Sequence, residues 1–330
     1  MQTRTRPGRR LAGVEVRLDA SVLVLVALVV WAFTGVFTAE YPTAVAVALA
    51  TVGAVLVVLT TLAHELGHAL EARYRGMEVE GITLLLFGGV TELHTEGQTA
   101  RDELAVAVVG PWVSLVCAAL FGLLATFADV LLPTAAAPAV AQIAGVLGWW
   151  NLLLAVFNLV PGAPLDGGRV LRALLWMALG DRLRALRISV RAGQVIGAGL
   201  AALGAATLWR AGASASLVAA ALVLSGAFLI RSAASELRHA ELSAALERHR
   251  VGELLTAPVA VDDDGVDRPD SDDPDLPGVG VEDDLHTLVE AFDGPHDRVR
   301  VLSEGRLLGV LSEAEVARAV GRLRRGEPLT

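Results

Sequence analysis

Lysine is missing from this sequence: all 27 basic residues are arginine. Cysteine occurs once, at Cys117, which excludes a disulfide framework and a cysteine-based zinc finger. Charged residues make up 19% of the chain and aromatic residues 5%, whereas an average soluble domain carries about 25% charge. The chain is 54% hydrophobic with a mean hydropathy of +0.57, but an average soluble domain is also about half apolar, so the low and locally concentrated charge is what excludes one uniform soluble domain.

The charges are unevenly distributed along the chain. Residues 1–238 hold 17 basic and 15 acidic side chains, whereas residues 239–330 hold 10 basic and 21 acidic ones. This pattern predicts a membrane-embedded part followed by an acidic soluble part, and it disfavours nucleic acid as a partner. An insert at 262–279 is rich in aspartate and proline and is expected to be disordered. Abundant aspartate without lysine favours a salt-adapted prokaryotic source.

Several apolar stretches are long enough to cross a lipid bilayer, whose core of about 30 Å needs about 20 residues of helix. The sequence predicts about six transmembrane helices, at 20–38, 43–71, 103–131, 139–160, 192–209 and 213–231. Arginines cluster before the first stretch and after the second, fourth and sixth. Since arginine-rich loops stay in the cytoplasm, we expect a multi-pass protein of the cell membrane with both termini cytoplasmic. The first stretch lacks a small-residue cleavage site, which favours an anchor over a removed signal peptide.

The second stretch contains the pattern His64-Glu65-Leu66-Gly67-His68. Residues four apart share one face of a helix, so both imidazoles can bind one metal ion. Glu65 lies beside them, where it can take a proton from a metal-activated water. The alternative is a helix end whose polar groups merely form hydrogen bonds at the interface, but ionisable residues within a membrane span are usually functional.

A third ligand is needed, because catalytic zinc usually takes three protein ligands. Asp166 is the candidate, since Pro161 and Pro164 break the preceding helix at membrane depth, where only a covered or water-lined segment is tolerated. Gly167 and Gly168 are expected to form a tight turn that brings the carboxylate inward, before a new helix starts. Alternatively, Asp166 only caps that helix.

The segments AHELGHA and NLVPGAPLDGGR together resemble the site-2 protease family of intramembrane zinc metalloproteases. The resemblance extends over about residues 15–231 and includes Asn158, the two prolines and the glycine pair. It implies one zinc ion bound by His64, His68 and Asp166, with Glu65 as the general base. Phe87-Gly88-Gly89 also resembles the family's short membrane-dipping hairpin.

Residues 79–93 are predicted to form that membrane-associated β-hairpin, because they are β-branched and apolar around a Gly-Gly break. An open strand edge can hold a substrate extended by β-augmentation, which makes Gly88 and Gly89 candidate substrate-binding positions. A plain re-entrant connector is the alternative. The Asn158 amide can bind the substrate backbone or a developing oxyanion, although a packing hydrogen bond is the competing interpretation.

The C-terminal part is predicted to begin with a helical linker at 232–250. Residues 251–330 then resemble a CBS (cystathionine-β-synthase) module with strand, turn, strand and helix near the end. Such modules normally come as a pair in one chain, and one copy is visible. The resemblance therefore implies either a homodimer formed through this module or a remnant, and a single copy makes nucleotide binding doubtful.

These observations predict an all-α polytopic membrane protein followed by a small α/β cytoplasmic domain. A basic arm at 1–19 precedes a metalloprotease domain at 20–231, the linker and the CBS-like domain. The expected activity is hydrolysis of peptide bonds in or near transmembrane segments of other membrane proteins. The alternatives are a membrane transporter regulated by the CBS-like module and a protease-like scaffold without catalysis. Intact candidate ligands argue against the scaffold, and the scarcity of polar residues in three spans argues against the transporter.

Overall fold

The computed structural model describes residues 9–85, 88–93, 99–133, 135–211, 216–255, 276–292, 296–325 and 327–329. Residues 262–275 of the acidic insert and Phe87 of the predicted hairpin lie outside this part. The chain divides into two compact units, Met1–Ala234 and Ser235–Thr330.

The first unit is mostly helical, as the sequence predicts. Its helices are α1 (Ser21–Phe37), α2 (Thr43–Tyr74), α3 (Ala100–Leu131), α4 (Ala137–Asn158), α5 (Asp166–Leu179), α6 (Arg182–Ala211) and α7 (Ser216–Arg248), the last continuing into the second unit. By length and apolar composition α2, α3, α4, α6 and α7 are candidate membrane spans. The first predicted span forms a shorter apolar helix of 17 residues, so five of the six expected spans meet this criterion.

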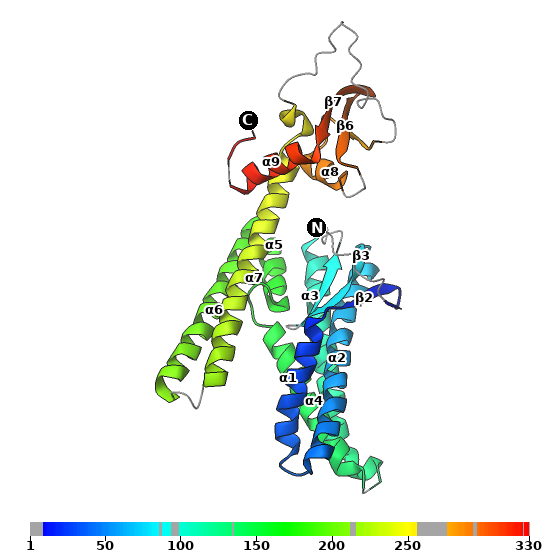
Figure 1. Ribbon diagram of the computed structural model, residues 1–330, viewed down its shortest axis with the longest axis vertical. Coiled ribbons are helices and arrows are strands. Elements are labelled where there is room, and N and C mark those ends of the chain that lie inside the picture. Colours follow the sequence, from blue (N-terminus) through cyan, green and yellow to red (C-terminus); the bar gives the residue numbers. More distant parts are fainter. Residues whose placement is uncertain are drawn as a thin grey trace. The chain divides into compact units, whose positions relative to one another are not determined.

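Helices α1, α2 and α4 share an apolar core and run alongside one another (Figure 1). Phe33 packs edge-on against Phe37 and Trp150, with ring centroids 6.2 and 6.4 Å apart. Small residues let α2 and α3 come close: a Cβ on Gly67 would lie 3.0 to 3.1 Å from the side chains of Val113 and Val109. This tight packing brings α3 against the face of α2 that carries the histidines.

A four-stranded sheet adjoins this bundle, with the order β1 (Arg9–Leu11), β2 (Val14–Leu18), β3 (Val79–Leu85) and β4 (Gly88–Leu93). Strands β3 and β4 form the predicted antiparallel hairpin. Within the expected basic arm at 1–19, β1 and β2 belong to this sheet, and β2 pairs in parallel with β3, about 65 residues later in the chain. Strands that short depend on distant pairing, which local sequence patterns do not reveal.

The second unit contains a three-stranded sheet of β5 (Gly278–Gly280), β6 (Arg298–Ser303) and β7 (Arg306–Ser312). Its helices are the 3-10 turn η2 (Val251–Leu254), α8 (Leu285–Glu290) and α9 (Glu313–Arg324), which follow the element order expected near the C-terminus. The backbone N–H and hydroxyl of Ser312 both donate to Glu315 at the start of α9, which lowers the pKa of that carboxyl. This capping box fixes where α9 begins.

Candidate metal centre

The two histidines of α2 and the aspartate of α5 converge on one point. The Nε2 atoms of His64 and His68 lie 3.2 Å apart. The Oδ2 atom of Asp166 lies 3.2 Å from the first of them and 3.3 Å from the second. The side chains of His64 and His68 are 3% and 4% exposed, and the Asp166 side chain is 13% exposed. Three potential ligand atoms thus form a nearly equilateral triangle inside the protein.

Helix α3 fixes both imidazole rings through their other nitrogen atoms. Nδ1 of His68 lies 2.7 Å from the carbonyl oxygen of Val106, and Nδ1 of His64 lies 2.9 Å from the Ser114 hydroxyl. A carbonyl can only accept, so Nδ1 of His68 must carry the proton and its Nε2 lone pair is free for a metal. The Ser114 hydroxyl can accept in the same way from His64. The ring of His68 is thus held in the tautomer that metal binding requires, and the Ser114 hydroxyl is compatible with the same tautomer in His64.

Gly110 on α3 leaves space next to the Nε2 atoms. A Cβ at this position would lie 2.1 Å from Nε2 of His68 and 2.7 Å from Nε2 of His64. Such distances are far below van der Waals contact. The missing side chain therefore leaves a cradle, beside the ligand triangle, that a single methyl group would fill.

Asp166 is the first residue of α5, which starts at the carboxylate itself rather than after the glycine pair as expected. Gly167 and Gly168 are helical and have negative φ, so the predicted tight turn is wrong. They are needed for close approach instead: a Cβ on Gly167 would lie 2.3 Å from the carbonyl oxygen of Leu159, and one on Gly168 would lie 2.3 Å from the backbone N of Ala163. The chain folds tightly back on itself to present Asp166.

The Asp166 carboxylate does not cap its own helix. Leu165 is the N-cap residue of α5, with no side-chain capping bond. Pro161 and Pro164 lie in the loop that separates α4 from α5, and the Ala163–Pro164 peptide bond is cis. The helix break that the prolines predict is present, and it directs the carboxylate toward the histidines.

Glu65 is 9% exposed and lies against strand β4. A Cβ on Gly89 would lie 2.2 Å from Cγ of Glu65 and 2.9 Å from Oε1. Only glycine lets the backbone of β4 pass this close to the carboxylate. The hairpin and the predicted base are therefore in direct contact.

The residues fit a zinc ion. Zinc prefers tetrahedral coordination by imidazole nitrogen and carboxylate oxygen at about 2.0–2.2 Å, for which neighbouring ligand atoms are roughly 3.3 Å apart. The triangle has sides of 3.2 to 3.3 Å, and Gly110 leaves a cradle beside it. Three protein ligands would leave one coordination position open, which is typical of catalytic rather than structural sites.

Comparison with known protein families gives two overlapping matches, at residues 52–133 and 126–200, to the model described as peptidase family M50. Residues 52–200 resemble this family, and we refer to them as the M50 domain. The matched range contains all three ligands and Glu65, together with Gly110 and Ser114 of α3.

The alignments with curated relatives are longer than residues 52–200. "Putative zinc metalloprotease Rip3" of Mycobacterium tuberculosis is 44% identical over 208 residues, covering 61% of this chain and 51% of that protein. "Putative zinc metalloprotease sll0528" of Synechocystis is 39% identical over 199 residues, covering 60% of this chain and 50% of that protein. The chain spans about half the length of these relatives. The solved structure of the site-2 protease from Methanocaldococcus jannaschii aligns with a TM-score of 0.49 at 23% identity, over 71% of this chain and 95% of that one.

A buried ion pair joins two helices of the M50 domain. Arg172 of α5 donates to Glu103 of α3, and their side chains are 11% and 4% exposed. Glu103 lies one turn before Val106, whose carbonyl holds His68. The pair thus fastens the helix that starts at Asp166 to the helix that orients the imidazoles. Removal of one partner from such a pair is strongly destabilising, because it leaves a buried charge uncompensated.

Other predicted site residues of the M50 domain are less directly placed. Asn158 is the half-buried last residue of α4, and within the described part of the chain its amide makes no hydrogen bond to the three ligands. Gly88 opens β4 next to Gly89. Their roles toward a substrate stay predictions.

The contribution of α3 is the part of the site that sequence reasoning missed. Val106, Gly110 and Ser114 recur every four residues and so lie on one face of α3. This spacing was a signal, but nothing in the sequence indicates that this face packs against the histidines. The pairing of α3 with α2 emerges only from the fold.

The orientation of His64 by Ser114 can be tested directly. We expect Ser114→Ala to lower zinc affinity about 10- to 100-fold, because the Nδ1 proton loses its acceptor and the ring loses its fixed direction. Zinc affinity is measured by competition with a chelator in detergent. Thr126→Ala is the matched control, since the Thr126 hydroxyl donates only to the Gly122 carbonyl of the same helix. Equal affinity in both variants would contradict the orienting role.

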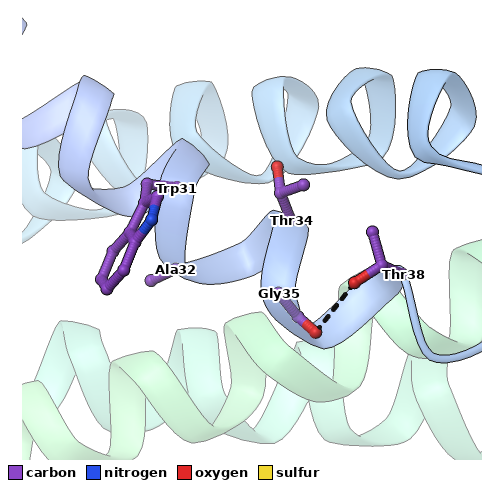
Figure 2. Close-up of a pocket in the computed structure, with 5 residues that line it drawn as sticks. All are labelled: Trp31, Ala32, Thr34, Gly35 and Thr38. Carbon is purple, nitrogen blue, oxygen red and sulfur yellow. Dashed lines mark hydrogen bonds between the residues drawn. The ribbon is translucent and has the colours of Figure 1, made fainter.

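A separate pocket lies on α1 and is lined by Trp31, Ala32, Thr34, Gly35 and Thr38 (Figure 2). Figure 2 shows the Thr38 hydroxyl directed at the Gly35 carbonyl, to which it donates at 3.2 Å. The five lining residues include no histidine, cysteine, aspartate or glutamate. The metal centre of the M50 domain is the stronger candidate site.

Proposed function

We propose that this chain is an intramembrane zinc metalloendopeptidase that hydrolyses peptide bonds in or near transmembrane segments of membrane-protein substrates. One observation carries the proposal: His64, His68 and Asp166 direct three ligand atoms at one point. Glu65 lies on the same apolar helix as the two histidines, α2. The M50 match and the names of the curated relatives support the same activity.

Bound zinc would polarise the scissile carbonyl and lower the pKa of a coordinated water toward about 7. Glu65 accepts the proton released by the attacking water and delivers it to the leaving amine. Ser114 and the Val106 carbonyl keep the Nε2 atom of each histidine directed at the centre of the ligand triangle. Burial of these groups strengthens their electrostatic effect, because little water screens them.

The substrate must become extended before it is cut, since a helix hides its peptide bonds in hydrogen bonds. Within the described residues β4 is an outer strand of the sheet, so a substrate strand could pair with it by β-augmentation. Gly89 brings β4 against Glu65 and would thereby bring a paired substrate close to the base. Gly88 and the Asn158 amide are the further groups that we assign to the substrate backbone.

We also infer six crossings of the lipid bilayer, with both termini in the cytoplasm. Because β2 precedes α1 and pairs with β3, which follows α2, the chain must leave and return to the same side between these strands. If α2 crosses the membrane, α1 must cross it too, and 17 residues of helix span about 26 Å. Arginine-rich connections support a cytoplasmic position for the sheet.

The second unit is proposed to be a CBS-like module through which two chains pair. The order β6, β7, α9 agrees with the strand, turn, strand and helix that carried this resemblance. We likewise propose the domain limits at 1–19, 20–231, 232–250 and 251–330. A salt-adapted prokaryotic source is a further proposal. Nucleotide binding by this unit is not part of the proposal.

Zinc removal and return test the proposed activity. Purified protein in liposomes is expected to cleave a single-span substrate, lose cleavage after treatment with a chelator and regain it on addition of zinc. Product masses locate the cut bond relative to the membrane segment. Cleavage that is unaffected by complete zinc removal would overturn the proposal. Absence of cleavage despite bound zinc, on a panel of single-span substrates, would favour a silent scaffold.

A further inference from the structure

Helix α6 carries two residues that touch the loop leading to Asp166. Ser189 and Gly193 are one helical turn apart and therefore lie on the same face of α6. Both are removed in sequence from the motifs that suggested the metal centre. Their contacts concern the backbone immediately before and after the third ligand.

Ser189 is fully buried and makes hydrogen bonds on both sides of Asp166. Its carbonyl oxygen accepts from the backbone N–H of Ala163 at 3.2 Å. Its hydroxyl donates to the carbonyl oxygen of Gly168 at 2.8 Å. One side chain and its own backbone thus hold positions three residues before and two residues after the ligand.

Gly193 lets the loop sit directly on α6. A Cβ at Gly193 would lie 1.9 Å from the carbonyl oxygen of Ala163, and a Cβ at Gly162 would lie 2.6 Å from the Gly193 backbone. This loop forms a tight turn, because the N–H of Leu165 donates to the Gly162 carbonyl at 3.1 Å. Asp166 directly follows Leu165, so a shift of this turn on α6 would be transmitted to the Asp166 carboxylate.

We propose that Ser189 and Gly193 of α6 are positioning residues for the third metal ligand, so that zinc affinity depends on a helix that contributes no ligand itself. The inference rests on the proposed zinc centre. The imidazoles are oriented from α3, whereas the Asp166 carboxylate is oriented from α6. The Arg172–Glu103 pair also ties α5 to α3, but a change at Ser189 or Gly193 touches neither imidazole, so the third ligand can be weakened alone.

A pair of glycine-to-alanine variants in α6 tests this proposal. Gly193→Ala places a methyl group against the Ala163 carbonyl, whereas the same change at Gly199 meets nothing within 4 Å. Both changes favour the helix equally. We expect Gly193→Ala to lower the affinity of the full-length protein for zinc about 10- to 100-fold, and Gly199→Ala to leave it within about twofold of wild type.

Ser189→Ala gives an independent measurement, because it removes the hydroxyl bond to Gly168 and adds no bulk. An approximately tenfold loss of zinc affinity is expected. Cobalt loaded in place of zinc should show an altered absorption spectrum in Gly193→Ala and Ser189→Ala, since the carboxylate ligand moves, and an unaltered one in Gly199→Ala.

The outcomes separate this inference from the proposed function. Wild-type affinity and spectrum in both Gly193→Ala and Ser189→Ala would overturn the positioning role while the zinc centre stands. An equal loss of affinity in Gly199→Ala would also overturn it. If Gly193→Ala does not fold, Ser189→Ala alone decides. Failure of wild-type protein to bind zinc would instead overturn the proposed function.

Discussion

Gly110→Ala is expected to abolish zinc binding, with an affinity loss of about 1000-fold or more. The new methyl group would lie 2.1 Å from Nε2 of His68 and 2.7 Å from Nε2 of His64, next to where the ion would bind. The rings cannot retreat easily, because Ser114 and Val106 hold them from the same helix that carries the methyl group. A loss of this size is comparable to the free energy contributed by about one or two ligands, since the total free energy of zinc binding is roughly 10–16 kcal/mol.

A fold defect is not the expected cause, since alanine favours a helix interior over glycine by about 1 kcal/mol. Gly122→Ala is the matched control, because a Cβ at Gly122 in the same helix meets nothing within 4 Å. Zinc content per chain after purification and chelator competition measure the effect in both variants. A Gly110→Ala protein that retains zinc as wild type does would exclude the cradle as part of the metal centre.

Glu65→Gln is expected to retain zinc but to lower the turnover number about 100- to 10,000-fold. Glutamine has nearly the same shape and polar reach as glutamate, so packing against Gly89 is preserved. It cannot accept the proton released by the attacking water, and it cannot deliver one to the leaving amine. Turnover of a single-span substrate in liposomes and zinc content of the same sample together measure the two properties.

Glu71→Gln serves as the control in the same helix, because Glu71 pairs with Arg75 at 2.7 Å and lies away from the ligand triangle. Its turnover should stay within about twofold of wild type, since surface ion pairs contribute little. Cleavage by Glu65→Gln at the wild-type rate would remove Glu65 from the role of base. Loss of zinc together with turnover would instead make it a ligand.

The ligands could be predicted because each depends on a local pattern. His64 and His68 are one turn apart in a helix, and that geometry follows from their spacing alone. Asp166 was indicated by the prolines that end α4 nearby. The hairpin of β3 and β4 was visible in the same way, because its strands are neighbours in the chain.

The supports of the ligands could not be predicted, because they depend on contacts between distant segments. Ser114 lies 50 residues from His64, and Ser189 lies 21 residues from the Gly168 carbonyl to which it donates. The parallel pairing of β2 with β3 is likewise long-range. The glycine pair after Asp166 shows the limit clearly: glycine indicated a special backbone position, but the reason was close approach and not a turn.

The contacts that hold the three ligands are all made within the chain, to Ser114, the Val106 carbonyl and Ser189. Small zinc domains differ, because in them the energy of metal binding is itself the energy of folding. We therefore expect folding and zinc binding to be separable in time in this protein. The polypeptide can be inserted into the bilayer and folded first and receive its ion afterwards. The supply of zinc, rather than completion of the fold, would then determine when a newly made molecule becomes active.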